Sequence, residues 1–120
     1  MVFGDLLSKL VRSVPGATAA VIMSYDGIPL EEFKRSDDIA LDLQTLAVEY
    51  SSLVKDIKKN AANLGTEGLQ EITIRTERWT LIIRLVNEEY FALLALDSSA
   101  YFGKGRYLLR STCSQVRAQL

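Results

Sequence analysis

The sequence predicts an α+β domain: a single five-stranded antiparallel sheet with helices on both faces, in the order α-β-β-α-β-β-β-α. Two observations lead to this prediction. Apolar residues recur every three or four positions in three segments, which is typical of helices, and they alternate or run continuously in five shorter segments, which is typical of strands. Short polar turns separate most of the neighbouring strands and favour antiparallel pairing. With 120 residues, of which 48% are hydrophobic, we expect one domain over residues 1–120.

The first predicted helix has one apolar face and ends at Pro15-Gly16, a pair that interrupts helices. Its apolar residues are Phe3, Leu6, Leu7, Leu10, Val11 and Val14. Residues 17–25 (ATAAVIMSY) then form a run of small or apolar side chains. Such a run is typical of a strand that is covered on both faces.

A hairpin follows at Asp26-Gly27, because glycine accepts the positive φ that a tight turn demands. We expect the second strand over residues 28–33. Pro29 lacks an amide donor, which places this strand at an edge of the sheet.

A long helix is predicted from about Asp38 to Leu64, with capping oxygens from Ser36, Asp37 and Asp38 and a stop at Gly65. At about 100° per residue, one apolar stripe occupies a narrow arc and is expected to face the sheet. This stripe comprises Ile39, Leu43, Leu46, Tyr50, Leu53, Ile57, Ala61 and Leu64.

Three strands come next, over residues 69–76, 79–86 and 90–96, joined by short polar connections into a meander. The last of them is apolar on both faces and is predicted to be central. A loop that ends in Gly103 and Gly105 opens the final helix. The apolar face of that helix consists of Leu109, Thr112, Cys113, Val116 and Leu120.

Beside the sheet-facing stripe of the long helix lies a second stripe of unusually small residues: Ala40, Ala47, Ser51 and Val54. Small residues also favour helix, or they allow a helix to sit close to its own domain. The interpretation that we adopt is a helix–helix interface between two copies of the chain. The strand over residues 69–76 is otherwise unprotected, and we expect its Glu71, Thr73 and Arg75 to add to this dimer interface.

Leu41 and Val48 lie seven residues apart and opposite the core stripe. Single exposed apolar residues are common on surfaces. The alternative is that both anchor a partner protein, with Gln44, Ser52 and Lys55 at the rim.

Residue types that support catalysis are scarce. The chain has no histidine and only one cysteine, Cys113, which we expect to be a core thiol. Gly103-Lys104-Gly105 lacks the remaining residues of a phosphate-binding loop. We therefore predict no enzymatic activity, no catalytic residues, no metal site and no cofactor.

The charge is balanced overall at −1 but unevenly distributed. Residues 1–97 carry ten Lys/Arg and fifteen Asp/Glu, whereas residues 98–120 carry four Lys/Arg and no acid. Arg106, Arg110 and Arg117 share one face of the last helix, which is either a solvated face or a docking face for an acidic partner or anionic lipid. Arg84 lies inside an apolar strand and calls for a carboxylate partner.

Two segments resemble the Roadblock/LC7 domain family. VPGATAAVIMSYDGIPL resembles the opening strand–turn–strand of these domains. YFALLALDSSAYFGKGRYLLR resembles their last strand and the Gly-x-x-Arg entry to the C-terminal helix, here Gly103 and Arg106. The long helix and the FGKGRY segment are most similar to the bacterial MglB/MglC group, particularly to MglC-like proteins.

The resemblance implies a homodimer in which the long helices pack antiparallel and the third strands pair edge to edge. It also implies a non-catalytic adaptor or regulator of a small Ras-like GTPase, acting directly or with another Roadblock protein, in bacterial cell polarity or motility. The alternative is a small-molecule-sensing α+β module. A single cysteine and no span long enough for a bilayer lead us to expect a cytoplasmic protein that binds no nucleic acid and inserts in no membrane.

Overall fold

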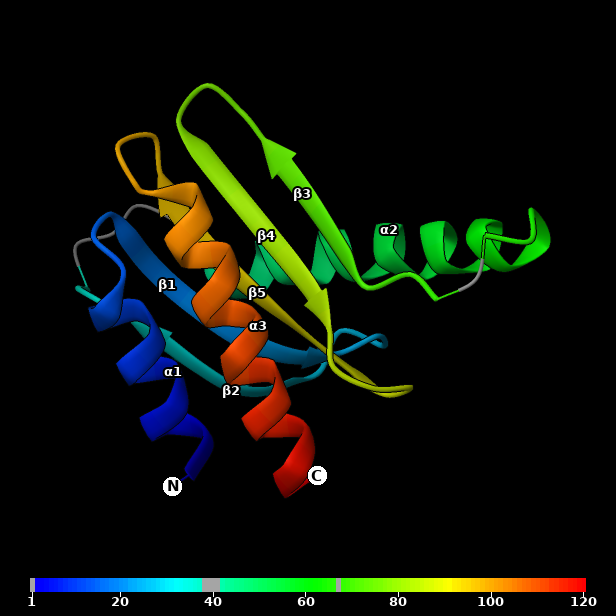
Figure 1. The fold of residues 1–120 in the computed structure, drawn as a ribbon, viewed down its shortest axis with the longest axis horizontal. Coiled ribbons are helices and arrows are strands. Elements are labelled where there is room, and N and C mark those ends of the chain that lie inside the picture. The colour runs from blue at the N-terminus through cyan, green and yellow to red at the C-terminus, as the bar shows by residue number, and fades with distance from the viewer. Residues whose placement is uncertain (1, 38–41, 67) are drawn as a thin grey trace.

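The computed structural model describes residues 2–37, 42–66 and 68–120, and it confirms the predicted fold class. Three helices and five strands follow one another in the order α-β-β-α-β-β-β-α (Figure 1). The elements are α1 (Val2–Ser13), β1 (Ala17–Ser24), β2 (Pro29–Lys34), α2 (Leu43–Asn63), β3 (Glu71–Arg75), β4 (Trp79–Leu85), β5 (Tyr90–Asp97) and α3 (Phe102–Gln119).

The five strands form one sheet in the order β2-β1-β5-β4-β3, and all neighbouring strands are antiparallel. The hairpin turn between β1 and β2 occurs as predicted, with Gly27 at a φ of 86°. β2 and β3 are the edge strands, and β5 is central. The meander of the last three strands is therefore confirmed.

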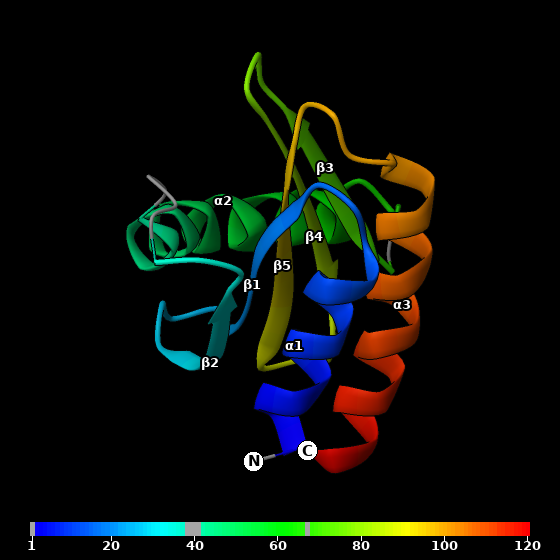
Figure 2. The ribbon, with the colours of Figure 1, turned by 90° about the vertical axis from the view of Figure 1, so that its left-hand side faces the viewer.

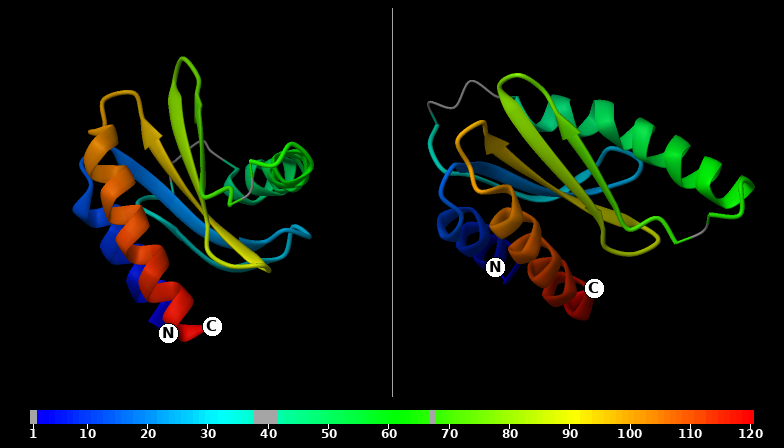
Figure 3. Two further views of the ribbon diagram at one scale, coloured as in Figure 1. Left: turned by 45° about the vertical axis from the view of Figure 1, so that its right-hand side comes forward. Right: turned by 45° about the horizontal axis from the view of Figure 1, so that its top comes forward.

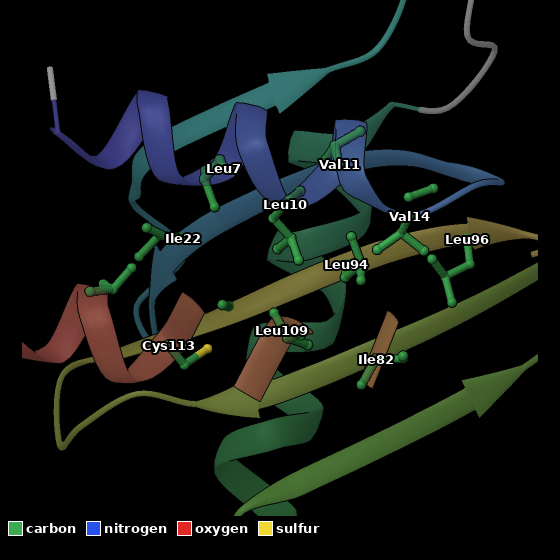
Figure 4. Close-up of a cluster of buried hydrophobic side chains, with 14 of the residues drawn as sticks. Leu7, Leu10, Val11, Val14, Ile22, Ile82, Leu94, Leu96, Leu109 and Cys113 are labelled. Atoms are coloured by element: carbon green, nitrogen blue, oxygen red, sulfur yellow. The ribbon is translucent and has the colours of Figure 1, made fainter. Parts of the chain in front are cut away.

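The helices divide unequally between the two faces of the sheet. α1 and α3 lie side by side on one face, whereas α2 lies alone on the other (Figures 2 and 3). The layer beneath α1 and α3 is a closed core in which Leu7, Leu10, Ile22, Leu109 and Cys113 are buried (Figure 4). The predicted apolar faces of the first and last helices pack here, except for Leu120, which follows the end of α3 and is 47% exposed.

The layer beneath α2 is built from the opposite face of the same strands. Val21, Ile83, Phe91 and Leu93 are fully buried there. Because side chains alternate along a strand, Trp79, Leu81, Ile83 and Leu85 share this face.

The start of the long helix corrects our prediction. α2 begins at Leu43 and is capped by Asp42, not by Ser36 or Asp37, and Asp38 lies outside the described residues. The Asp42 carboxylate accepts hydrogen bonds from the backbone N–H (3.1 Å) and the hydroxyl (2.8 Å) of Thr45. These two bonds hold the pKa of Asp42 below its usual value. The predicted stop is confirmed, since Gly65 has a φ of 72° immediately after the C-cap.

The glycines near the last helix also differ from our expectation. Gly103 and Gly105 do not end a loop but lie inside the first turns of α3, which begins at Phe102. A Cβ on Gly105 would lie 3.2 Å from Cδ1 of Leu96. Gly105 therefore lets α3 approach β5 closely, a reason for glycine that the sequence did not reveal.

Candidate partner-binding surfaces

The small stripe of α2 faces the sheet of its own chain, which corrects our assignment of these residues to a dimer interface. Ala47 and Val54 are 0% exposed and Ser51 is 5% exposed, all beneath the helix. α2 lies closest to β1, where the small Ala19 belongs to the same buried layer. Small side chains are needed here because the helix approaches the strand closely. Ala40, the fourth residue of the stripe, lies outside the described residues.

The stripe that we expected to face the sheet is instead largely turned away from it. Leu43 is buried, but Leu53 is 40% exposed and Leu64 is 78% exposed. Leu46, Tyr50, Ile57 and Ala61 are only half-buried, and Ile39 lies outside the described residues. We call the residues Leu46, Tyr50, Leu53 and Ile57 the lateral face of α2. Leu46 and Tyr50 pack against the core beneath α2, and Leu53 is the most exposed residue of the lateral face. An apolar face that the described part of the chain covers only in part marks an interaction surface.

The sheet beside the lateral face is also incompletely covered. A five-stranded sheet measures about 19 Å between its outer strands, whereas one helix is about 10 Å wide. Two helices cover the opposite face, whereas α2 is the one described helix on this face, where it contacts β1 most. On β3 and β4, Ile72, Ile74, Trp79 and Leu85 remain half-buried. We call this incompletely buried part of the sheet the uncovered strip.

β3 forms the edge of the sheet next to this strip. Among the described strands it pairs only with β4, so its outer edge can pair with a strand of another chain. Its Glu71, Thr73 and Arg75 point to the α3 side. The Glu71 carboxylate is held by arginines of its own chain, the Arg75 guanidinium lies 5.4 Å from the centre of the Phe102 ring, and Thr73 is exposed. Backbone pairing of β3 would therefore involve these residues chiefly through their main chain.

The residues that we assigned to partner binding lie together where α2 crosses the β1–β2 hairpin. Val48 is 45% exposed, and Gln44, Ser52 and Lys55 are exposed around it. Lys55 forms an ion pair with Asp26 of the hairpin (3.6 Å). Leu41 lies outside the described residues.

Sequence reasoning missed one apolar residue near this surface. Ile28, at the hairpin tip, is 66% exposed. The preceding Gly27 faces Val48, because a Cβ there would lie 3.6 Å from a Val48 methyl group. The position directly after an Asp-Gly turn is a signal that could have found Ile28, since a hairpin tip leaves it little cover. We call Gln44, Val48, Ser52 and Lys55 the Val48 patch; Ile28 follows Gly27 in the chain and lines a separate hollow with Tyr90.

The arginines on and beside the last helix have different environments. Arg84, which lies in an apolar strand, has the carboxylate partner that we predicted: its Nη1 lies 3.4 Å from Oε1 of Glu71. Arg106 Nε donates to Oε2 of the same glutamate (2.6 Å). Arg117 Nε donates to the Val86 carbonyl (2.6 Å). Arg110 is exposed at the surface. The three arginines of α3 therefore do not form one uniform solvated face.

Two side chains have strongly raised pKa values because they are buried, namely Cys113 and Tyr25. Burial raises the pKa of the Cys113 thiol to about 12. Burial, with a smaller contribution from Glu88, raises the pKa of Tyr25 to about 12, and its hydroxyl donates to the Asn87 carbonyl (3.0 Å). Both groups are protonated at neutral pH, which suits packing and hydrogen bonding and not nucleophilic chemistry.

This leads to a prediction about Cys113. Because the thiolate is the reactive form, native protein at pH 8 should react with a disulfide reagent at least about 100-fold more slowly than urea-unfolded protein. Ellman's reagent followed by absorbance measures both rates, and the single cysteine makes the signal unambiguous. Equal rates in the two states would show that Cys113 is accessible in the native protein.

The fold and these surfaces define a small α+β interaction domain with an uncovered helix face, a free sheet edge and an exposed apolar patch. The match to protein-family models is to the Roadblock/LC7 domain, over residues 3–96. The chain belongs to the Roadblock/LC7 family. A comparison with curated proteins found no match.

Solved structures place the chain more closely within this family. MglC from Myxococcus xanthus is 38% identical over 100% of both chains, with a TM-score of 0.73. MglB from Thermus thermophilus, described as a gliding protein, is 21% identical over 97% of this chain and 86% of its own, with a TM-score of 0.87. An MglB described with a tetrameric arrangement is 22% identical over 98% and 86%, with a TM-score of 0.88. The two MglB structures have the same fold as this chain, and MglC is similar to it in sequence as well as in fold.

Proposed function

We propose that this chain is a non-catalytic, homodimeric adaptor or regulator of a small Ras-like GTPase, acting directly or together with another Roadblock protein. The observation that carries the proposal is the lateral face of α2, an apolar helix surface beside a half-covered sheet, in a chain 38% identical to MglC. The resemblance to MglB and MglC supports a role in bacterial cell polarity or motility, and with it a cytoplasmic location. Within the described residues, none of the helices is long and apolar enough to cross a membrane.

Dimerisation follows from the uncovered strip on the α2 side of the sheet. A second copy related by a two-fold axis would lay its α2 antiparallel beside the first, and would cover Ile72 and Trp79 with the lateral face. The same axis would bring the two β3 edges together and satisfy their free backbone groups. The large residues Tyr50 and Leu53 are of the kind that dominates such interfaces. The dimer interface is therefore the lateral face with β3, and no longer the small stripe.

Partner binding is assigned to the Val48 patch. This patch lies on the α2 side of the molecule, so a dimer would present two copies of it beside the paired helices. Val48 supplies the apolar anchor, and Lys55, Gln44 and Ser52 supply a polar rim. Two small patches make a surface large enough for specific binding only when they are joined, which couples dimerisation to partner recognition.

The small-molecule-sensing alternative has less support. The sheet layers on both faces are filled by fully buried side chains. A hollow of about 780 Å³ near Tyr25 is lined by Lys55, Lys58 and Glu88, whose charges are already paired within the chain. An apolar, enclosed pocket with a few unpaired polar groups is the usual form of a ligand site.

A substitution in the Val48 patch tests this function. Val48→Asp should reduce GTPase or co-regulator binding at least about 30-fold, because it places a charge where an apolar anchor is desolvated. The side chain is nearly half exposed, so we expect the melting temperature and the dimer to change little. The measurement is capture from native cytosol, followed by titration calorimetry with the purified captured protein.

Lys9→Glu, at an exposed position of α1 on the opposite face of the sheet, is the matched control and should leave GTPase binding intact. Loss of binding in Lys9→Glu but not in Val48→Asp would place the docking site on the face that carries α1 and α3. If the native bait captures neither a Ras-like GTPase nor a Roadblock protein, the proposed function itself is contradicted.

A further inference from the structure

A small cavity on the α3 side of the sheet gathers three arginines around one glutamate. Its volume is about 280 Å³, and it lies between the start of β3 and the first half of α3. Arg84, Arg106 and Arg110 line it with Glu71, and Gln70, Phe102, Gly103 and Tyr107 complete the lining. We call it the arginine cavity. The lateral face and the Val48 patch lie on the other side of the sheet, so it is a separate surface.

The charges in the arginine cavity are not balanced. Glu71 is the sole carboxylate among the described residues that line it, so three arginines leave a formal charge of +2. The Glu71 side chain is only 13% exposed, and its two oxygens are divided between Arg84 and Arg106. The Arg110 guanidinium forms no hydrogen bond or ion pair with the described residues, and it is exposed at the rim. Each guanidinium carries five N–H donors, so most of the donors here remain available.

The planar guanidinium groups of these arginines, and the fixed orientation of Arg84, suit the binding of a carboxylate. Arg84 is 14% exposed and is fixed across the strands by Glu71, so its orientation is set before any ligand arrives. A fixed guanidinium recognises planar carboxylates through paired hydrogen bonds. Binding then costs little ordering of the Arg84 side chain.

The surroundings favour a protein segment as the occupant. The volume is below the range of small-molecule pockets and accommodates one or two side chains. Tyr107 lines the cavity and is 71% exposed, and Tyr101, the N-cap residue directly before the cavity-lining Phe102, is 68% exposed. Tyrosine and arginine are among the residues that dominate protein–protein contacts. Residues 98–120 contain no acid, so a negatively charged chain meets no repulsion along α3.

We propose that the arginine cavity and the flanking tyrosines bind an acidic segment of a partner protein, with an aspartate or glutamate side chain seated between Arg84, Arg106 and Arg110. The incoming carboxylate competes with Glu71 for the guanidinium groups of Arg84 and Arg106. Arg110 contributes an additional cation, and the tyrosine rings pack against the apolar parts of the segment. The site is present in each protomer and does not depend on the dimer.

Fluorescence anisotropy with the full-length protein tests this proposal. The probe is a fluorescein-labelled peptide of alternating glutamate and leucine, and the matched probe has glutamine in place of glutamate. We expect the glutamate peptide to bind, the glutamine peptide to bind at least about tenfold more weakly, and added salt to weaken the first. Absence of binding, or equal binding of both peptides, would overturn the proposal.

Two variants separate a binding role from a structural one. Arg110→Ala should weaken peptide binding about tenfold, whereas Lys59→Ala, which removes an exposed cation on α2, should not. Glu71→Gln should tighten binding, because it removes the competing carboxylate. If Glu71 only holds the fold together, Glu71→Gln will lower the melting temperature without tightening binding, and the proposed competition is wrong.

Two further probes test the choice of occupant. Inorganic phosphate should displace the peptide only weakly, since it makes no use of the tyrosines. Vesicles containing phosphatidylglycerol should not be bound more strongly than vesicles of neutral lipid. Efficient displacement by phosphate, or Arg110-dependent binding to the anionic vesicles, would overturn the assignment to a protein segment.

Discussion

Ala47→Glu is expected to unfold the protein and not merely to dissociate a dimer. Ala47 is 0% exposed between α2 and the sheet, where a glutamate would be both too large and without a cationic partner. Overpacking and an uncompensated buried charge together should lower the free energy of unfolding by about 3–5 kcal/mol. Small domains have only about 5–15 kcal/mol in total. Urea titration followed by circular dichroism measures the loss.

Ala62→Glu is the matched control, because Ala62 is an exposed alanine on the same helix. It should change stability by less than about 0.5 kcal/mol. A folded Ala47→Glu protein with native stability would show that the small stripe is not in the core, and would restore our first assignment of it to the dimer interface.

Leu53→Glu is expected to have the opposite outcome, a folded monomer. Leu53 is 40% exposed on the lateral face of α2, so the isolated chain tolerates a charge there. In the proposed dimer the same side chain is desolvated near the two-fold axis, and its replacement should raise the dimer dissociation constant at least about 30-fold. Multi-angle light scattering across a protein dilution series measures the dissociation constant.

Ser52→Glu provides the control for this experiment. Ser52 is the neighbour of Leu53 in the chain but faces away from the lateral face, in the Val48 patch. Its substitution should leave the dimer unchanged. A native protein that is monomeric at about 10 μM, near the weak end of specific association, would contradict the proposed dimer before any variant is made.

Ala47→Glu and Leu53→Glu together distinguish the buried face of α2 from its lateral face. Our prediction from the sequence had assigned these two faces the wrong way round. Periodicity finds apolar stripes on a helix, but it does not say which of two adjacent stripes meets the sheet. The size of the stripe residues misled the assignment: large aliphatics were given to the core and small residues to the dimer. In the structure the helix–strand approach is close, so Ala47 and Ser51 are buried, while Tyr50 and Leu53 lie toward the uncovered strip.

The sequence by itself determined the order of the elements, the hairpin at Asp26-Gly27, the central place of the last strand and the family resemblance. These features depend on local turn chemistry and on side-chain alternation, which act over a few residues. It also indicated that Arg84 needs an acid, although not that Glu71 supplies it.

Only the tertiary structure decided which face of α2 is free, where α2 and α3 begin, and how the arginines divide between internal bonds and the surface. The rotation of α2 is set by the fit of Ala47, Ser51 and Val54 against β1, which comes from a distant part of the chain. The arginine cavity likewise joins strand residues to α3 across 35 positions, from Glu71 to Arg106. Contacts of this kind depend on three-dimensional packing between segments that are far apart in the sequence. They cannot be predicted from the sequence because no local pattern encodes them.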